Sequence, residues 1–200
     1  MKRELVLATA NKDKAIEIYE ILASLPLEII TIEAYPGLIL PEEDQATFRG
    51  NAILKAEAVS AYSGKMAVAD DSGLVVDALD GRPGVYSARY AGPDGDYEAN
   101  NRLLLEELKE VPYENRSARF ICAIALCIPG KRTYVVKGSC PGRITMALSG
   151  SKGFGYDPLF YYEPAGKTFA EMSRGEKNTV SHRGRALRNL RGLLKQLLTI

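Results

Sequence analysis

The sequence predicts a mixed β-sheet within an α/β or α+β domain. Strand-like and helix-like segments alternate in the first part of the chain, which is typical of parallel strands joined by helices. Two apolar segments on either side of Pro129-Gly130 then indicate a hairpin, and therefore antiparallel pairing. Because we find no internal repeat, low-complexity tract or linker, we expect one domain over residues 1–200.

The first half of the chain is predicted from short apolar runs, helical spacing of apolar side chains and clusters of Gly, Pro and acids. A polar Ala-Asp-Asp-Ser-Gly segment interrupts the last apolar run of this half. The expected elements are a strand over residues 4–9, a helix from Asn11 to about Leu22, a strand over 27–32, a loop over 36–44, a helix over about 45–61, and strand pieces over 66–69 and 74–76.

The second half is predicted in the same way. Two segments rich in Gly and Pro are expected to be loops, and the last helix places its leucines on one stripe and its basic side chains on another. The expected elements are a loop over residues 82–95, a helix over 97–109, hairpin strands over 118–128 and 133–138, a loop over 149–157, and a helix that starts near Asn178 or Thr179.

Composition excludes several classes of protein. The 26 Lys+Arg against 25 Asp+Glu give a net charge of +1, so a broad basic face for duplex nucleic acid is not expected. No apolar run is long enough to span a membrane, and the first residues lack the pattern of a signal peptide. The three cysteines do not form a disulfide framework or a zinc motif, which favours a reducing compartment, the cytoplasm.

Thr9-Ala10-Asn11-Lys12-Asp13-Lys14 lies where the first predicted strand meets the first helix. Backbone N–H groups at a helix start have no partner within the helix, and the helix dipole is positive there. Lys12 and Lys14 add two cationic side chains. The segment therefore predicts an anion site, and the alternative is an Asn cap followed by lysines that only face water.

Asp70 and Asp71 interrupt an apolar strand, where buried carboxylates need a partner or a metal ion. If the backbone stays extended, the two side chains point to opposite faces, so only one of them can readily face a given site. Magnesium takes one or two carboxylates and completes its shell with water and phosphate oxygens. One aspartate of the strand and one glutamate of a loop would supply these carboxylates. The alternative is an Asx turn with Ser72-Gly73.

Two further segments predict contacts to a ligand. Gly153 to Asp157 form a loop in which Phe154 or Tyr156 could stack on a base while Asp157 or a loop amide reads its edge. Aromatic residues beside glycine also occur in plain turns. His182, the only histidine, lies among basic residues near the start of the last helix, where a neutral ring could donate to a ligand carbonyl. A single histidine is more often structural.

Six motifs in order along nearly the whole chain resemble the inosine triphosphate pyrophosphatase family. Two departures are Ala10, where that family usually has Gly, and Arg49-Gly50, where acidic or polar residues are frequent; neither removes a functional group. The motifs are ATANKDK, NAILKA, ADDSGL, GRPGVYSARYAG, GFGYDPLF and EKNTVSHRGRAL.

The resemblance implies a long twisted mixed sheet flanked by helices, two lobes with a central substrate cleft, and a homodimer. It also implies Mg²⁺-dependent hydrolysis of deaminated purine nucleoside triphosphates, such as those of inosine, deoxyinosine and xanthosine, to monophosphate and pyrophosphate. By position, Asp71 would accept the proton, and Glu42 and Asp71 would bind the metal. The implied substrate-binding residues are Thr9, Ala10, Asn11, Lys12, Asp13, Lys14, Lys55, Ser72, Phe154, Gly155, Tyr156, Asp157, Lys177, His182 and Arg183.

Two other functions fit parts of this pattern. A pyrophosphatase acting more broadly on modified bases would keep the phosphate and metal groups and change the base pocket. A nucleotide-binding regulator without turnover would lose the metal carboxylates, but Glu42 and Asp71 are both present.

Overall fold

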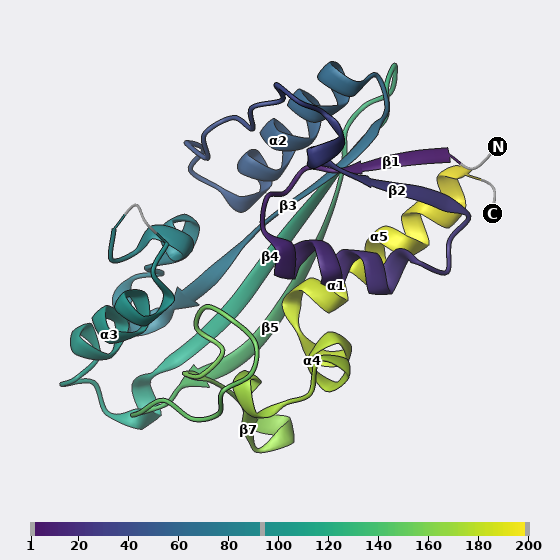
Figure 1. The fold of residues 1–200 in the computed structure, drawn as a ribbon. Coiled ribbons are helices and arrows are strands. Elements are labelled where there is room, and N and C mark those ends of the chain that lie inside the picture. Colours follow the sequence, from purple (N-terminus) through teal and green to yellow (C-terminus); the bar gives the residue numbers. More distant parts are fainter. Residues whose placement is uncertain (1–2, 93–94, 199–200) are drawn as a thin grey trace. The chain divides into compact units, whose positions relative to one another are not determined.

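A computed structural model of the chain describes residues 3–92 and 95–198 (Figure 1). Within these residues, seven strands form one sheet in the order β2-β1-β3-β4-β5-β6-β7. β1 is parallel to β2 and β3, whereas β6 is antiparallel to β5 and β7. The predicted mixed sheet with flanking helices is therefore confirmed.

The elements follow the predicted order. The strands are β1 (Arg3–Leu7), β2 (Leu27–Thr31), β3 (Met66–Val76), β4 (Ser117–Cys127), β5 (Tyr134–Ile144), β6 (Phe160–Tyr162) and β7 (Lys167–Thr168). The α-helices are α1 (Lys12–Leu22), α2 (Phe48–Ser63), α3 (Tyr97–Glu107), α4 (Arg174–Val180) and α5 (His182–Leu198). Short 3₁₀ turns occupy several of the connections.

Two expectations about strands were wrong. β3 runs without interruption through Asp70 and Asp71, because both buried carboxylates have partners and the backbone can stay extended. β5 continues past Gly138 to Ile144. Its glycines and Pro141 look like strand breakers in the sequence, but Pro141 is exposed, and a Cβ on Gly142 would lie 2.5 Å from the Tyr161 carbonyl oxygen. Close approach of β6 thus requires glycine there.

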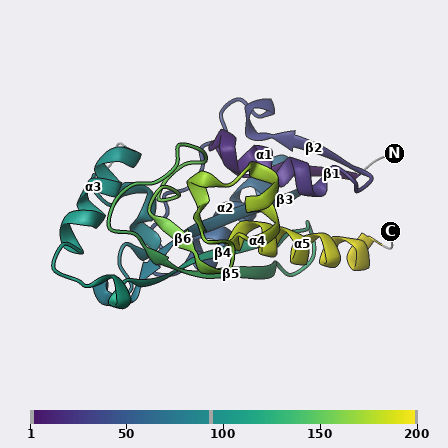
Figure 2. The ribbon, with the colours of Figure 1, turned by 90° about the horizontal axis from the view of Figure 1, so that it is seen from below.

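The single C-terminal helix was also a wrong expectation, because the structure has two helices there (Figure 2). α4 begins after Ser173, whose side chain accepts the Glu176 N–H while the Glu176 carboxylate accepts the Ser173 N–H. This capping box fixes a helix start before Asn178. Ser181 then adopts an extended conformation with ψ 158°, which ends α4, and α5 follows.

The chain divides into two compact units. Unit 1 comprises residues 1–71, 122–138 and 183–200, and unit 2 comprises residues 72–121 and 139–182. The chain passes from one unit to the other within β3, β4 and β5, and after the first residue of α5.

In unit 1, alternate residues of each strand pack against different helices. Leu5 and Leu7 of β1 join a core with α1 and α5, whereas Val6 and Ala8 join a second core with α2. β3 follows the same alternation, since Met66 and Val68 belong to the first core and Ala67 and Ala69 to the second. Asp70 and Asp71 continue this pattern, so their side chains point to different faces of the strand.

A buried ion-pair network holds α1, β3 and α5 of unit 1 together. Asp70, which is fully buried, accepts the Arg183 Nε–H at 3.1 Å and pairs with Lys14 Nζ at 3.3 Å. Arg183 also donates through Nη1 to Glu17 Oε2 at 2.6 Å. Burial by itself would raise the pKa of the Asp70 carboxyl, but Lys14, Arg183 and Lys55 outweigh it and hold that pKa below its ordinary value.

In unit 2, one apolar core contains the aromatic rings of Phe120, Phe160 and Phe169. Beside it, the buried Arg116 guanidinium donates to the carbonyl oxygens of Leu108 and Val111, just beyond the end of α3. These bonds link the segment after α3 to the residue before β4, and the Leu108 carbonyl oxygen also accepts the Val111 N–H at 2.9 Å.

Two further findings concern membrane spans and the cysteines. Within the described ranges, no helix is both long and apolar enough to cross a membrane. Cys122, Cys127 and Cys140 are free thiols, and Cys122 and Cys140 are buried.

We predict that Asp70→Asn lowers the free energy of unfolding by about 3 kcal/mol at neutral pH, because Lys14 and Arg183 would remain partly or fully buried without their carboxylate. Urea denaturation measures this change. Since the Asp70 pKa is lowered in the folded state, its stabilisation is present at neutral pH and is lost only as pH falls through that lowered pKa.

The matched control is Asp77→Asn, which removes an exposed carboxylate that pairs with Arg119 at 2.6 Å. Exposed pairs contribute less than about 1 kcal/mol, so the control is expected to stay near wild type. Equal effects of the two substitutions would contradict a structural role for the Asp70 network.

Candidate active site

The turn between β1 and α1 is ordered by hydrogen bonds to side chains. Thr9 Oγ1 accepts the Asn11 N–H at 3.2 Å, and Asn11 Oδ1 accepts the Lys14 N–H at 3.0 Å. Asn11 thereby caps α1, whose first turn presents backbone N–H groups and the positive end of the helix dipole. The exposed side chains of this turn belong to Ala10, Lys12 and Asp13. The turn is suited to an anion such as phosphate.

Asp71 lies on the α2 face of β3 and is 4% exposed. Asn51 of α2 donates its Nδ2–H to Asp71 Oδ2 at 2.9 Å, and Asn51 Oδ1 accepts the Gln45 N–H at 2.9 Å. Burial, together with the charge of Glu43, raises the pKa of the Asp71 carboxyl above its ordinary value. A carboxylate with a raised pKa is a better proton acceptor than an ordinary one.

Lys55 lies one turn beyond Asn51 on α2, so both side chains reach toward the middle of β3, at Asp70 and Asp71. Its ammonium group donates to the Asp70 carbonyl oxygen at 2.7 Å and to the Glu43 carboxylate. Burial would lower the pKa of Lys55, but Asp70 and Glu43 outweigh burial and raise it. Lys55 is therefore a cation at neutral pH.

Of the two loop glutamates, Glu43 contacts Lys55 and its charge helps to raise the pKa of Asp71, whereas Glu42 is exposed. Within the described residues, no group of three or more His, Cys, Asp or Glu side chains could hold a metal ion. The site nevertheless fits Mg²⁺. Asp71, whose pKa is raised by burial and by the charge of Glu43, and Glu43 itself supply two carboxylates, and Mg²⁺ usually takes its remaining ligands from water and phosphate.

The loop over residues 153–157, in unit 2, is closed by Asp157. Asp157 is 2% exposed, and its Oδ2 accepts the Phe154 N–H at 2.9 Å and the Lys177 ammonium at 2.5 Å. Gly153 has φ +75°, and a Cβ there would lie 2.0 Å from Asp157 Oδ2, so the turn requires glycine. Lys177 Nζ also lies 4.6 Å from the centre of the Phe154 ring.

Other predicted base-contacting residues of unit 2 have internal contacts. Tyr156 is buried and donates its hydroxyl to the Ser87 carbonyl oxygen at 2.9 Å. His182 is buried and stacks on Phe120, with ring centres 4.6 Å apart and planes 11° apart. Ser72 and Gly155 are partly exposed. These contacts do not test whether the residues touch a substrate, so that role stays a prediction.

The structure therefore joins two groups of predicted residues by direct contacts. In unit 1, Lys14, Lys55 and Arg183 surround the Asp70–Asp71 segment. Arg183 lies between Glu17 and Asp70 and is 2% exposed, so its charge serves this buried network. In unit 2, Asp157 links Lys177 to Phe154 within the loop over residues 153–157, hereafter the Phe154 loop.

Sequence reasoning missed three polar residues of the unit 1 group, namely Glu17, Glu43 and Asn51. Asn51 had a detectable signal, because it lies four residues before Lys55 within a predicted helix, so both share one face. Glu17 stands among apolar residues of α1 but reads as an ordinary surface residue. Nothing in the local sequence distinguishes Glu43 from Glu42.

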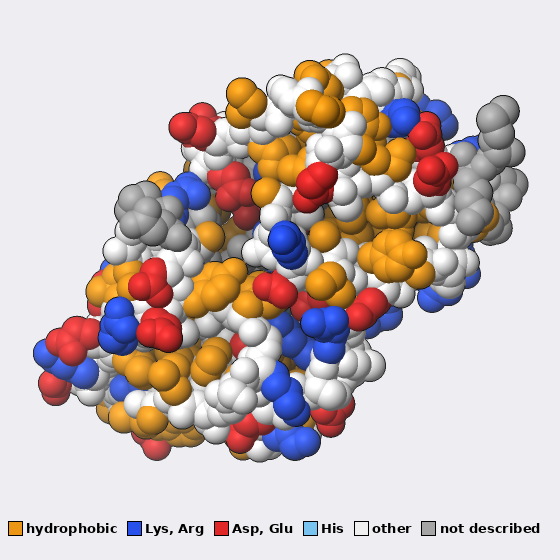
Figure 3. All heavy atoms as spheres, in the orientation of Figure 1, with side chains coloured by type: hydrophobic (Ala, Val, Ile, Leu, Met, Phe, Trp, Pro, Cys, Tyr) orange, Lys and Arg blue, Asp and Glu red, His pale blue; other side chains and the backbone are white. Residues whose placement is uncertain are grey.

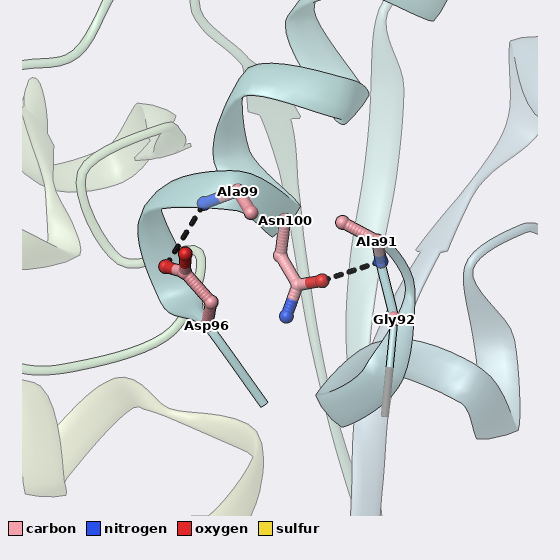
Figure 4. Close-up of a pocket in the computed structure, with 5 residues that line it drawn as sticks. All are labelled: Ala91, Gly92, Asp96, Ala99 and Asn100. Carbon is pink, nitrogen blue, oxygen red and sulfur yellow. Dashed lines mark hydrogen bonds between the residues drawn. The ribbon is translucent and has the colours of Figure 1, made fainter. Parts of the chain in front are cut away.

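A separate pocket of about 150 Å³ lies in unit 2 and contains none of the predicted site residues. Its lining residues are Ala91, Gly92, Asp96, Ala99 and Asn100 (Figure 4). Asn100 Oδ1 accepts the Ala91 N–H at 2.7 Å, and Asp96 Oδ1 accepts the Ala99 N–H at 3.1 Å. These bonds tie the start of α3 to the preceding loop.

Comparison with known proteins places this chain in a family. The model of the Ham1 family matches residues 5–193. A dITP/XTP pyrophosphatase of Geobacter sulfurreducens is 53% identical over 92% of both chains, and one of Desulforamulus reducens is 49% identical over 97% of this chain and 96% of its own.

Solved structures agree. A HAM1 protein from Coxiella burnetii has a TM-score of 0.90 and 38% identity, covering 97% of this chain and 99% of its own. A nucleoside-triphosphatase / dITP/XTP pyrophosphatase from Mycobacterium abscessus has a TM-score of 0.78 and 42% identity, covering 94% and 98%. On a family match spanning nearly the whole chain and relatives at this level of identity, the chain belongs to the Ham1 family.

Proposed function

We propose that this protein hydrolyses deaminated purine nucleoside triphosphates, those of inosine, deoxyinosine and xanthosine, to the monophosphate and pyrophosphate. The names of the Geobacter and Desulforamulus relatives, dITP/XTP pyrophosphatase, support this substrate class. The observation that carries the proposal is the Asp71 carboxylate, with its raised pKa, close to the buried Lys55 cation and the anion-binding start of α1.

In this proposal, the residues of unit 1 bind the triphosphate and activate water. The turn from Thr9 to Lys14 and the Lys55 ammonium hold phosphate oxygens, and they offset the negative charge that builds on the leaving pyrophosphate. Asp71 accepts the proton of the attacking water, and Asn51 fixes the orientation of its carboxylate. Asp70 does not contact substrate, because Lys14 and Arg183 engage its carboxylate.

A magnesium ion would be held by Asp71 together with a glutamate of the 42–43 loop. When bound, Mg²⁺ neutralises phosphate charge and favours departure of pyrophosphate. The resemblance assigns the loop ligand to Glu42, and the contact of Glu43 with Lys55 makes Glu43 the residue to compare with it.

The residues of unit 2 are proposed to bind the base. Phe154 supplies the partly exposed aromatic face, and Lys177 supplies a donor beside it, held in place by Asp157. A donor suits the 6-oxygen of hypoxanthine and xanthine, whereas the 6-amino group of adenine would face another donor. Gly155, Tyr156 and His182, together with Arg183 of unit 1, remain proposed contacts to the base, and Ser72 remains a proposed contact to the substrate.

We also propose a cytoplasmic homodimer without a nucleic-acid or membrane partner. Three free thiols suit a reducing compartment. Hydrophobic side chains are exposed over α1 and α2 (Figure 3), including Ile16, Tyr19 and Tyr62, and such surfaces often mark contacts between subunits. Light scattering after size-exclusion chromatography measures the assembly.

We predict that the purified protein releases pyrophosphate, and no phosphate, from inosine triphosphate, and that chelation of divalent cations abolishes release. The basic turn and the carboxylates would stabilise charge on pyrophosphate as the leaving group. Separate assays of pyrophosphate and phosphate measure the bond that is cleaved. Stoichiometric phosphate without pyrophosphate would exclude this bond choice.

We predict that Asp71→Asn reduces turnover at least ~10²-fold, the scale of a lost general base, while nucleotide binding is partly retained.

Glu42→Gln is expected to raise the Mg²⁺ concentration needed for half-maximal rate, and Glu43→Gln is its matched comparison one residue away. Initial rates measured over a range of Mg²⁺ concentrations give this value for the two glutamate variants. If only Glu43→Gln shifts the magnesium dependence, Glu43 is the ligand.

We predict that kcat/KM for inosine triphosphate exceeds that for adenosine triphosphate by up to ~10⁴-fold, the discrimination that a buried hydrogen bond to the base can give. Lys177→Met keeps much of the side-chain length but removes the donor, so the ratio is expected to fall. Steady-state rates with both nucleotides measure it. If the full ratio survives, the loop over residues 153–157 discriminates without Lys177.

A further inference from the structure

The N-terminal half of α3 contacts the Phe154 loop at two points within unit 2. The Tyr97 ring lies 6.2 Å from the Phe154 ring, centre to centre, with the planes tilted by 36°. Asn101 is buried and donates its Nδ2–H to the Gly155 carbonyl oxygen at 3.0 Å. Tyr97 and Asn101 are four residues apart, so they share one face of the helix.

The part of α3 that makes these contacts is itself firmly anchored. Asp96 caps the helix by accepting the N–H groups of Glu98 and Ala99 at 2.8 and 3.1 Å. On another side, Asn100 accepts the Ala91 N–H at 2.7 Å and donates to the Ala88 carbonyl oxygen at 3.2 Å (Figure 4). A helix start fixed in this way can hold a neighbouring loop in one conformation.

α3 contacts the loop at Phe154 and Gly155. Asp157 accepts the Phe154 N–H, and Lys177 Nζ lies 4.6 Å from the centre of the Phe154 ring. The Tyr97 ring adds a further contact that restricts rotation of the Phe154 ring about its side-chain bonds. Gly155 has φ +63°, in the left-handed region, and glycine has more backbone freedom than any other residue. Asn101 holds the Gly155 carbonyl oxygen.

We propose that Tyr97 and Asn101 are positioning residues for base recognition, which hold the Phe154 ring and the Gly155 backbone in the conformation that receives the purine. This inference rests on the proposed function, because that function assigns the base to Phe154. Neither residue touches the substrate in this proposal. They reduce the ordering that the loop would otherwise undergo when the base binds.

The expected effect is a loss of affinity for the base without a loss of affinity for phosphate. An aromatic pair and a neutral hydrogen bond each contribute enough for about a 3- to 10-fold change in binding. Tyr97→Leu and Asn101→Leu remove one contact each while preserving side-chain bulk. Tyr97→Phe keeps the ring and is expected to behave as wild type.

The experiment is calorimetric titration of the full-length variants with inosine monophosphate and, separately, with pyrophosphate. Arg102→Ala is the matched control, since Arg102 lies on the same helix and, among the described residues, its ion pair is an exposed one with Glu98 at 3.7 Å. We expect Tyr97→Leu and Asn101→Leu to weaken inosine monophosphate 3- to 10-fold and to leave pyrophosphate unchanged. In turnover assays, KM for inosine triphosphate should rise by the same factor while kcat stays within about twofold.

Three outcomes would overturn the inference. They are wild-type affinity for inosine monophosphate in both leucine variants, equal weakening of both ligands, and no binding of inosine monophosphate by the wild-type protein. Failure of the proposed function is distinguishable, because it shows as absent hydrolysis of inosine triphosphate by the wild-type protein. The calorimetric comparison does not depend on hydrolysis.

Discussion

Two adjacent carboxylates within one buried strand impose the main constraint on this protein. Each charge must be compensated where it lies, and the alternation of β3 sends the two side chains to different faces. On one face, Asp70 is matched by Lys14 and Arg183, which ties together α1, β3 and α5. On the other face, Asp71 receives an amide hydrogen from Asn51 and lies near Lys55.

This division separates a structural carboxylate from a chemical one. Strong cationic compensation lowers the pKa of Asp70, so that its charge is permanent at neutral pH. Weaker compensation leaves the pKa of Asp71 raised, so that binding of a proton or a cation stabilises this carboxylate. Unit 2 repeats the structural solution, because Asp157 both neutralises Lys177 and closes the turn at Phe154. Preorganised charges of this kind need no rearrangement when a ligand binds.

Much of the fold was predictable because local patterns determine it. The strand, turn and helix at residues 4–22, the hairpin and the opposite orientations of Asp70 and Asp71 all follow from periodicity and turn residues. The uninterrupted β3 and the long β5 were not predictable, since they depend on distant partners such as Asn51 for Asp71 and the Tyr161 backbone for Gly142. Residue patterns predicted the turn at Lys14, the carboxylate pair and the Phe154 loop, and the resemblance supplied the remaining site residues. Neither showed that Tyr156 and Asp157 have internal contacts or that Glu43 engages Lys55.

Among the described residues, seven of the nine buried hydrophobic ones in the core beneath α2 are alanine, and their small size determines how far the side chains of α2 must reach to β3. Ala52 and Ala56 of the helix meet Ala67 and Ala69 of β3, all with almost no exposed surface. Small side chains let the helix backbone approach the strand closely, which is why the short Asn51 side chain spans the gap to Asp71. The alanine layer thus acts as a thin spacer. A thicker layer of leucine or valine would preserve hydrophobic burial, yet it would leave the amide too far away to orient the carboxylate.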